Sequence, residues 1–155
     1  MIWNEKIECM PREDMKNLQS ERLKKIVSYV YNNCPTYKEK FKEKDLTPAD
    51  IKSIDDIKKI PFTTKEDMRD HYPFGLFSVP REKLVEIHVS SGTTGNPTLV
   101  GYTPQDITLW SDVMARTLCC AGAEPNDIIQ IAYGYGLFTG GLGFHYGALE
   151  MGLTI

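Results

Sequence analysis

Basic residues are scarce in the second half of the sequence: no lysine follows Lys83, and Arg116 is the only arginine beyond it. A Gly-Lys pair is absent altogether, which excludes the phosphate-binding motif G-x-x-x-x-G-K-[ST]. No apolar run is as long as a membrane span, and residues 1–6 lack the apolar core of a signal peptide. With a net charge of −3, the chain is not expected to bind nucleic acid or an anionic membrane. We therefore predict a cytoplasmic protein.

Cysteine is also scarce, and its positions do not suggest a metal site. The four cysteines form no C-x-x-C motif, and no histidine stands at the spacing of a zinc ligand. We expect free thiols in a reducing compartment and no protein-bound metal. The length of 155 residues suits one domain, and 41% hydrophobic with 25% charged residues is ordinary for a soluble globular protein.

Charge is distributed unevenly along the chain. All basic residues except Arg116, and most acidic ones, lie in residues 1–86. This indicates a charged, mainly helical first half and a second half that forms a buried sheet with a ligand-binding face. We place the boundary between residues 83 and 84, so that 1–83 form a helical region and 84–155 the first part of an α/β subdomain. The two together would make one incomplete domain.

Helical spacing dominates the first half. Apolar residues between Met15 and Tyr31 recur at helical intervals and predict an amphipathic helix over about 12–33. A shorter helix is expected over 37–44. Three further helix starts are predicted at Thr47, Ser53 and Thr64, because each is followed by a proline or by acidic residues in the first turn.

Strands and helices alternate in the second half. We predict strands over 85–89, 99–102 and 128–132, helices over 104–122 and 142–151, and the beginning of a strand at 153–155. The apolar face of the first of these helices is expected to consist of Ile107, Trp110, Met114, Leu118 and Ala121. This order is typical of βαβ units in a parallel α/β sheet. Because globular domains seldom end in an uncovered strand, we expect the 155 residues to be the front piece of a longer protein.

The segment from Ser90 to Thr98 carries the most specific signal. It reads SSGTTGNPT and lies between two predicted strands. Its two glycines allow successive N–H groups to point inward as an anion-binding nest, and its hydroxyls can add donors to phosphate oxygens. A polar β-hairpin loop is the alternative, since all of these residues are common in turns.

Three segments together resemble the adenylate-forming acyl- and aryl-CoA ligases, and within them the phenylacetate–CoA ligase group. They are IPFTTKED at 60–67, the loop at 90–97 with LVGYT after it, and YGYGLFTGG at 133–141. The similarity covers the chain from about Trp3 to Ile155 but only the first third of such an enzyme. Thr98 stands where much of the superfamily has lysine, and the phenylacetate-type group is similar in having threonine there.

The resemblance implies an ATP-dependent ligase that forms an acyl-adenylate and then an acyl-CoA thioester. ATP, Mg²⁺ and coenzyme A would be needed, and an aryl acid such as phenylacetate would be the substrate. The β- and γ-phosphates would contact the loop, through Ser90, Ser91, Gly92, Thr93, Thr94 and Gly95. The aryl-acid pocket would contain Tyr133 and Phe138, with Tyr135, Gly140 and Gly141 as further candidates. Packing of the aromatic rings in the core is the alternative.

The resemblance also implies that parts of the enzyme are missing. The adenine-contacting segment, the acidic magnesium ligand and the C-terminal catalytic lysine of the family all lie downstream, so no catalytic residue is expected here and the chain alone should be inactive. His88 is expected to be a satisfied core histidine, whereas His145 could face the aryl pocket or simply pack. The alternative function is a non-catalytic module for phosphate or an aromatic acid that assembles with itself, as a homodimer, or with another chain.

Overall fold

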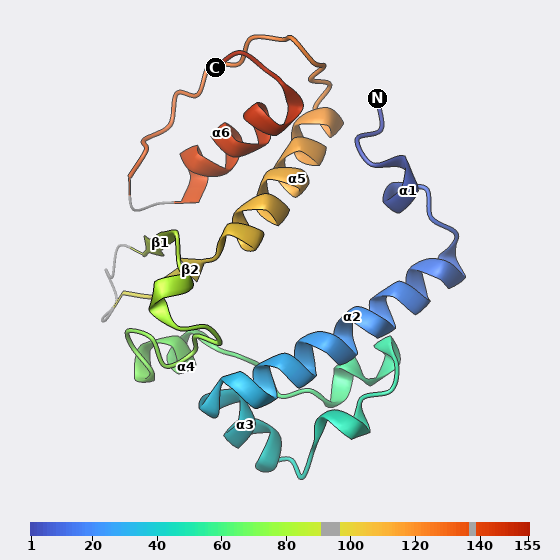
Figure 1. Cartoon of the computed structure of the whole chain (residues 1–155), viewed down its shortest axis with the longest axis vertical. Coiled ribbons are helices and arrows are strands. Elements are labelled where there is room, and N and C mark those ends of the chain that lie inside the picture. The colour runs from blue at the N-terminus through green and yellow to red at the C-terminus, as the bar shows by residue number, and fades with distance from the viewer. Residues whose placement is uncertain (91–96, 137–138) are drawn as a thin grey trace. The chain divides into compact units, whose positions relative to one another are not determined.

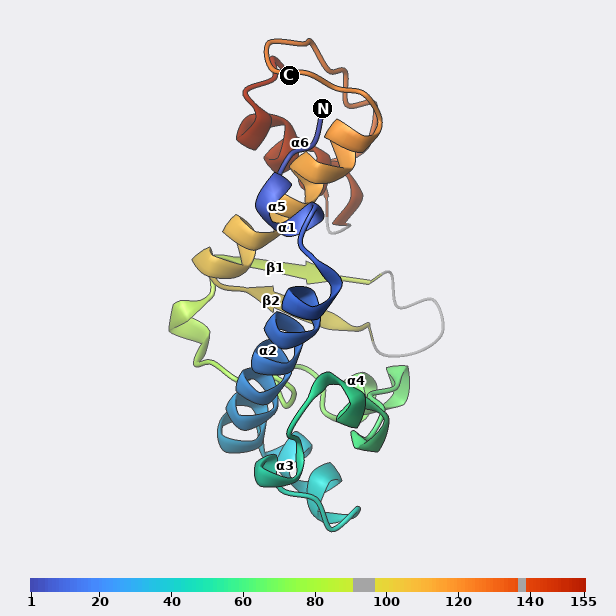
Figure 2. The same ribbon diagram turned by 90° about the vertical axis from the view of Figure 1, so that its right-hand side faces the viewer.

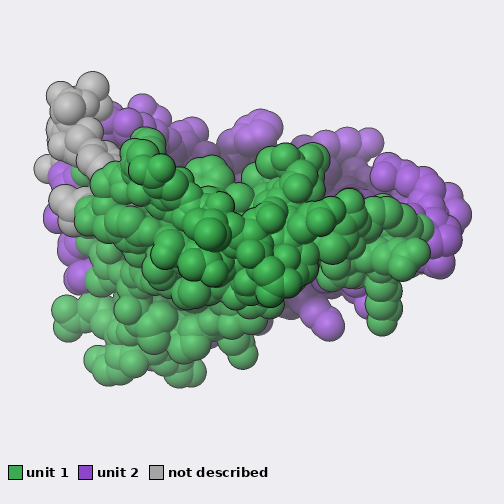
Figure 3. Space-filling view, turned by 90° about the horizontal axis from the view of Figure 1, so that it is seen from above, with its two compact units in different colours: residues 1–9, 81–93, 99–155 green, residues 10–80, 94–98 purple. Residues whose placement is uncertain are grey.

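The computed structural model describes residues 1–90, 97–136 and 139–155 (Figure 1). The chain divides into two units, which are coloured separately in Figure 3. The first consists of residues 1–9, 81–93 and 99–155, and the second of residues 10–80 and 94–98. We call them the sheet unit and the helical unit.

The helical unit is built from three α-helices and two 3₁₀ helices: α2 (Arg12–Asn33), α3 (Pro35–Lys42), η1 (Pro48–Asp50), η2 (Ile54–Lys59) and α4 (Lys65–Asp70). The helix predicted over 12–33 is confirmed. The next one begins at Pro35 rather than at Tyr37, because Cys34 is extended and the proline takes the first helical position. The starts predicted at Thr47, Ser53 and Thr64 are all confirmed as capping boxes, two of which open 3₁₀ helices.

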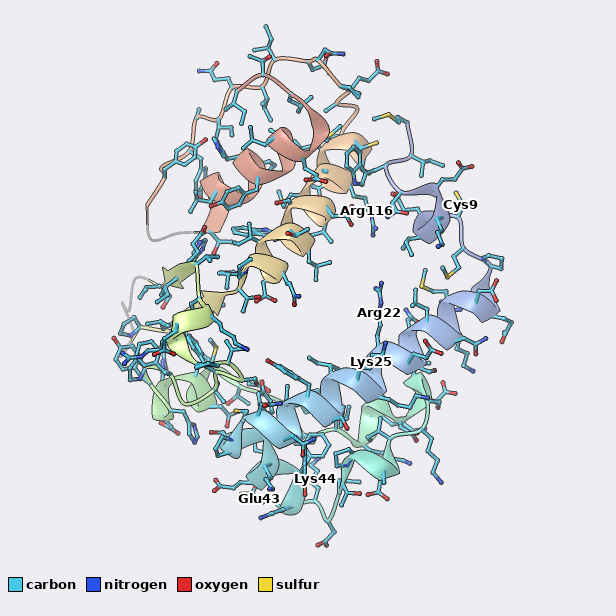
Figure 4. All side chains as sticks on the ribbon, viewed as in Figure 1. Cys9, Arg22, Lys25, Glu43, Lys44 and Arg116 are labelled. Carbon is cyan, nitrogen blue, oxygen red and sulfur yellow. The ribbon has the colours of Figure 1, made fainter. Side chains whose placement is uncertain are left out.

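The core of the helical unit is small and made of large side chains. Val27, Phe41 and Ile51 are buried, and the ring of Tyr31 meets that of Phe41 edge-on at a centroid distance of 6.0 Å. Most of α2 remains exposed, and Figure 4 shows Arg22 standing out from it on the side away from α3. The helices and the exposed positions of α2 agree with the expectation of a charged, mainly helical first half.

The sheet unit contains α1 (Glu5–Glu8), η3 (Arg81–Lys83), β1 (Glu86–Val89), β2 (Leu99–Tyr102), α5 (Pro104–Cys120) and α6 (Thr139–Met151). The strands predicted on either side of the glycine-rich segment are confirmed. They pair antiparallel, as Figure 2 shows. Glu86 lies opposite Tyr102, and Val89 lies opposite Leu99. The segment between them therefore starts and ends at the same end of the strand pair.

The predicted parallel sheet is the main correction. Among the described residues, 128–132 and 153–155 form no strands, only a single parallel bridge between Ile128 and Thr154. Two backbone hydrogen bonds accompany it, from Ile129 N–H and Thr154 N–H. Ile128 is 83% exposed, and parallel strands are stable when both of their faces are covered. The apolar pattern of 128–132 therefore does not produce a buried strand here.

Helices α5 and α6, rather than a sheet, form the core of the sheet unit. A Cβ atom at Gly143 would lie 2.8 Å from Cζ2 of Trp110, and one at Gly147 would lie 2.6 Å from Cβ of Met114. Glycine at these positions thus lets the two helices approach closely. The buried side chains around this contact are small or flexible: Ala115, Leu118, Cys119, Ala148, Met151 and Leu153.

The face of α5 that packs against α6 differs in part from the predicted apolar face. Ala121 was expected on that face but is exposed just beyond the end of the helix, whereas Ser111, Ala115 and Cys119 are buried on it. At this contact, Gly143 of α6 lies against the ring of Trp110, and Gly147 lies against Met114 and the backbone of Ala115. The helix predicted over 104–122 ends at Cys120, and the one predicted from Leu142 begins at Thr139.

The N-terminal residues are held on α5 by polar contacts. Nε1 of Trp3 donates a hydrogen bond to Asp112 at 2.8 Å, and Arg116, labelled in Figure 4, pairs with Glu8 at 3.4 Å. The Cys119 thiol donates to the carbonyl of Met1 at 3.1 Å. These contacts explain why residues 1–9 belong to the sheet unit. None of the helices in the described ranges is long and apolar enough to cross a membrane.

Candidate functional site

The candidate phosphate loop follows β1 directly. Of its six predicted residues only Ser90 belongs to the described part of the chain, and Ser91, Gly92, Thr93, Thr94 and Gly95 lie outside it. Ser90 comes immediately after Val89, which pairs with Leu99 of β2. The hairpin therefore fixes both ends of this segment, while the roles of its residues stay predictions.

Three of the predicted aryl-pocket residues lie together at the start of α6. A Cβ atom at Gly140 would lie 2.8 Å from Cε1 of Tyr133, and one at Gly141 would lie 3.0 Å from the carbonyl oxygen of Gly134. The glycines thus allow the chain around Tyr133 to lie directly on the first turn of α6. Tyr133 remains 63% exposed, so its ring is not part of a closed core in this structure. Phe138 lies outside the described residues.

Tyr135 contacts α6 through its phenol. Its hydroxyl lies 3.1 Å from Nδ1 of His145, and the two rings meet edge-on at a centroid distance of 5.6 Å. Tyr135 itself is 52% exposed, and His145 also meets the ring of Tyr146 edge-on. The structure therefore brings His145 next to Tyr135, one of the predicted pocket residues, and next to Tyr146, and a role of His145 in an aryl pocket stays a prediction.

A network of hydrogen bonds joins β1 to α6. His88 is only 4% exposed, and its Nε2 is hydrogen-bonded to Oε1 of Glu86. On its other side, Nδ1 lies 3.0 Å from Oγ1 of Thr139, the first residue of α6. The Tyr146 hydroxyl donates to Oε2 of Glu86 at 2.5 Å. The expectation that His88 is a satisfied core histidine is confirmed.

Aromatic rings enclose this network. The rings of Tyr102 and Trp110 stack with centroids 5.3 Å apart, and His88 meets both of them edge-on. Tyr146 meets Trp110 edge-on from α6. These contacts leave the imidazole of His88 little freedom to rotate.

The electrostatics keep the two phenols of this cluster neutral. The hydrogen bond to the Glu86 carboxylate raises the pKa of Tyr146 to about 12, and burial adds to the effect. Burial, followed by the charge of Glu86, also raises the pKa of Tyr102. Tyr146 therefore acts as a stable hydrogen-bond donor to Glu86 over the whole physiological range of pH.

Sequence reasoning missed Glu86, Thr139 and Tyr146. The detectable signal was the spacing of Glu86 and His88, because residues two apart on a strand share one face of it. An acidic residue beside a histidine on the inner face of a strand indicates a paired polar group. Thr139 and Tyr146 gave no comparable signal, since their partners lie more than fifty residues away: the separations are 51 and 60.

No metal site is formed by the described side chains: no three His, Cys, Asp or Glu residues among them are grouped to hold an ion. The four cysteines are free thiols: Cys34 and Cys119 are buried, whereas Cys9 and Cys120 are exposed. What the described part of the site offers is an exposed aromatic surface on a glycine-rich turn, next to the end of a hairpin.

The chain is similar over its whole length to known proteins. No protein-family model matches the chain. It is, however, 50% identical over 155 residues to a phenylacetate–coenzyme A ligase of Thermus thermophilus, covering all of this chain and 35% of the relative. The predicted resemblance to phenylacetate–CoA ligases is confirmed. Phenylacetate–CoA ligases of Escherichia coli and Aromatoleum evansii are 50% and 52% identical, with 36% and 34% of their lengths covered.

Solved structures support the likeness to CoA ligases at a coarser level. A 2-hydroxyisobutyryl-CoA ligase in complex with 2-HIB-AMP and CoA, in the thioesterification state, is similar with a TM-score of 0.86 and 29% identity over 93% of this chain. An open conformation of that ligase gives a TM-score of 0.85. The match covers 31% and 34% of those two chains. The chain thus corresponds to the N-terminal part of CoA ligases and spans about a third of the length of the phenylacetate–CoA ligases that it matches.

Proposed function

We propose that the chain is the N-terminal part of an ATP-dependent ligase that joins an aryl acid of the phenylacetate type to coenzyme A. The observation that carries the proposal is the identity of about half of all residues, over the whole chain, to ligases named for phenylacetate. The likeness to a CoA ligase bound to an acyl-adenylate and CoA supports the same chemistry.

Two steps follow from this proposal. The acid's carboxylate attacks the α-phosphate of ATP, forming the acyl-adenylate and releasing pyrophosphate. The thiolate of coenzyme A then attacks the acyl carbon and AMP leaves. Positioning of the reacting groups and stabilisation of phosphate charge supply the catalysis in both steps.

The roles of this chain's residues in the two steps are binding and orientation. The N–H and hydroxyl groups of residues 90–95 would hold the β- and γ-phosphates. Tyr133 and Phe138 would contact the aryl ring, with Tyr135, Gly140 and Gly141 beside them. Mg²⁺ would be bound together with ATP, mainly by parts of the ligase that these 155 residues do not contain. The 155 residues alone should not form acyl-CoA.

A chimera tests the proposal. Residues 1–155 would replace the aligned N-terminal part of the Thermus thermophilus ligase, and formation of phenylacetyl-CoA from ATP, phenylacetate and coenzyme A would be measured. We expect activity from the chimera and none from the 155-residue chain. An inactive but folded chimera would contradict the proposal, and binding of phenylacetate or ATP by the chain alone would then favour the non-catalytic module.

The aryl pocket is tested in the same chimera. Replacing Tyr133 by alanine removes a ring contact worth about 1 kcal/mol, so kcat/KM for phenylacetate should fall about fivefold. Tyr133→Phe keeps the ring and should retain most of the activity. Ile57→Ala, at an exposed apolar residue of the helical unit, is the control and should change nothing. Equal loss in the alanine and phenylalanine variants would show that the ring contact is not what matters.

A further inference from the structure

The carboxylate of Glu86 is shared between a strand and a helix. One of its oxygens is bonded to Nε2 of His88 on the same strand, and the other accepts the Tyr146 hydroxyl of α6 at 2.5 Å. Its side chain is 19% exposed, and the contacts that the structure gives it come from an imidazole and a phenol. A carboxylate withdrawn this far from water stays favourable only because both oxygens accept hydrogen bonds.

This arrangement fixes the hydrogen-bonding role of Nε2 of His88. Because the Glu86 carboxylate accepts, Nε2 carries a proton and donates. Nδ1 and the hydroxyl of Thr139 are 3.0 Å apart, and a hydrogen bond joins them in either protonation state of the ring, because a hydroxyl can both donate and accept. His88 is thus held from β1 and itself holds the first residue of α6.

The two residues joined by this hydrogen bond differ in how firmly their surroundings hold them. His88 is buried and packed against Tyr102 and Trp110, whereas Thr139 is exposed. The rigid partner is therefore the imidazole, and the hydroxyl at the start of α6 is the group whose place it determines. Along the sequence, His88 stands two residues before Ser90, and Thr139 stands directly after Phe138.

We infer that Glu86 and His88 are positioning residues of the ligase, which set the start of α6, and with it the aryl-acid segment, in register with the strand that leads into the phosphate loop. The inference rests on the proposed function and deepens it. Adenylate formation requires the acid's carboxylate in line with the α-phosphate, and a misplacement of 1 Å can cost on the order of a hundredfold in rate. One hydrogen bond between the two segments is placed to prevent such a displacement.

The same chimera, now carrying Thr139→Val, tests this inference. Valine keeps the shape of threonine but removes the hydroxyl that meets His88. The matched control is Ser111→Ala, which removes a buried hydroxyl of the same unit whose 2.8 Å bond to the Ile107 carbonyl stays within α5. Thr139→Ser restores the hydroxyl and serves as the conservative rescue.

The readouts separate positioning from folding. We expect Thr139→Val to lower kcat for adenylate formation, measured as pyrophosphate release at saturating ATP and phenylacetate, by about tenfold or more. The KM for ATP and the thermal midpoint should match those of the Ser111→Ala control, and Thr139→Ser should recover most of the rate. Tyr146→Phe, which frees one oxygen of Glu86 but leaves the ring in place, should lower kcat in the same direction by a smaller factor.

The outcomes that overturn the inference are distinct from those that overturn the proposed function. If Thr139→Val turns over at the rate of the Ser111→Ala control, the hydrogen bond does not position the site although the ligase assignment stands. The inference also fails if the loss of rate is matched by a loss of thermal midpoint and serine does not rescue it. An unsubstituted chimera without activity contradicts the proposed function itself, and the inference with it.

Discussion

The two units of the chain share one way of satisfying acidic groups, and the sheet unit adds another. In the helical unit, Asp50, Asp56 and Asp67 each accept a hydrogen bond from the backbone N–H of a Ser or Thr three residues earlier and so close a capping box. Asp106 does the same with Thr103 in the sheet unit. Glu86 of the sheet unit instead accepts from Tyr146, which is 60 residues away, and this long-range contact lies in the region proposed to bind substrate.

The hydrophobic cores of the two units also differ, in the size of the side chains that pack in them. The helical unit packs large side chains such as Phe41 and Ile51 against one another, and both are almost fully buried. The sheet unit relies on glycine and alanine, which let α5 and α6 approach until Gly147 has no room for a methyl group. A core of the first kind is sensitive to lost volume, and a core of the second kind to added volume.

The largest effect is expected from Phe41→Ala. The cavity left by a buried phenylalanine should lower the free energy of unfolding by about 3–5 kcal/mol. Hydrogen exchange followed peptide by peptide would place the loss in α2 and α3. Phe62, which is 87% exposed, gives the control Phe62→Ala, expected to change stability by less than about 0.5 kcal/mol. Similar losses in both variants would contradict the assignment of the core.

The added-volume counterpart is Gly147→Ala. Alanine is the better helix former by about 1 kcal/mol, but its Cβ would lie 2.6 Å from that of Met114. Since overpacking typically costs about 1–3 kcal/mol, we expect net destabilisation, with faster hydrogen exchange in α5 and α6. Gly134→Ala is the control, because a Cβ there meets nothing within 4 Å. A stabilised Gly147→Ala variant would show that the helices are not in close contact.

A smaller effect is expected from acid. The Lys40 ammonium, 2.6 Å away, and the N–H of Thr64 hold the pKa of Asp67 below its ordinary value of 3.8. The stability that this carboxylate contributes is complete above pH 3.8 and is lost as the pH falls through the lower folded pKa. In Asp67→Asn, the helical unit should therefore lose less stability between about pH 5 and pH 2, measured by urea unfolding at each pH.

The exposed Asp70, at the end of the same helix, supplies the control for that measurement. Asp70→Asn should leave the steepness of the acid-induced loss unchanged. If both variants flatten the profile equally, general charge reduction explains the effect and the bond between Lys40 and Asp67 does not.

The features that could be predicted from the sequence are those that depend on local contacts, and the features that could not be predicted depend on long-range ones. The helix over 12–33 is determined by periodicity, and the helix after Thr103 is determined also by the capping box that Thr103 forms with Asp106. The strands beside the SSGTTG segment were equally clear. The prediction of a strand over the apolar run 128–132 was wrong. A strand also needs neighbouring strands to pair with, and the pattern of apolar residues does not show whether such strands are present.

The candidate site divides likewise. Tyr133, Gly140 and Gly141 were recognisable because they stand in one short segment, and the structure brings them together. The partners of Glu86 could not be predicted, since no local rule connects a strand residue to Tyr146. Contacts between residues far apart in the sequence, such as that between Glu86 and Tyr146, became visible only in the structure.

The most direct test of the proposed assignment is a crystal structure of the chimera with phenylacetate and a non-hydrolysable ATP analogue. We expect the β- and γ-phosphates to lie against the N–H and hydroxyl groups of residues 90–95, and the phenyl ring to contact Tyr133 beside Gly140. Phosphates bound away from residues 90–95, or a phenyl ring that does not touch the 133–141 segment, would contradict the assignment of this chain as the substrate-binding front part of a phenylacetate-type ligase.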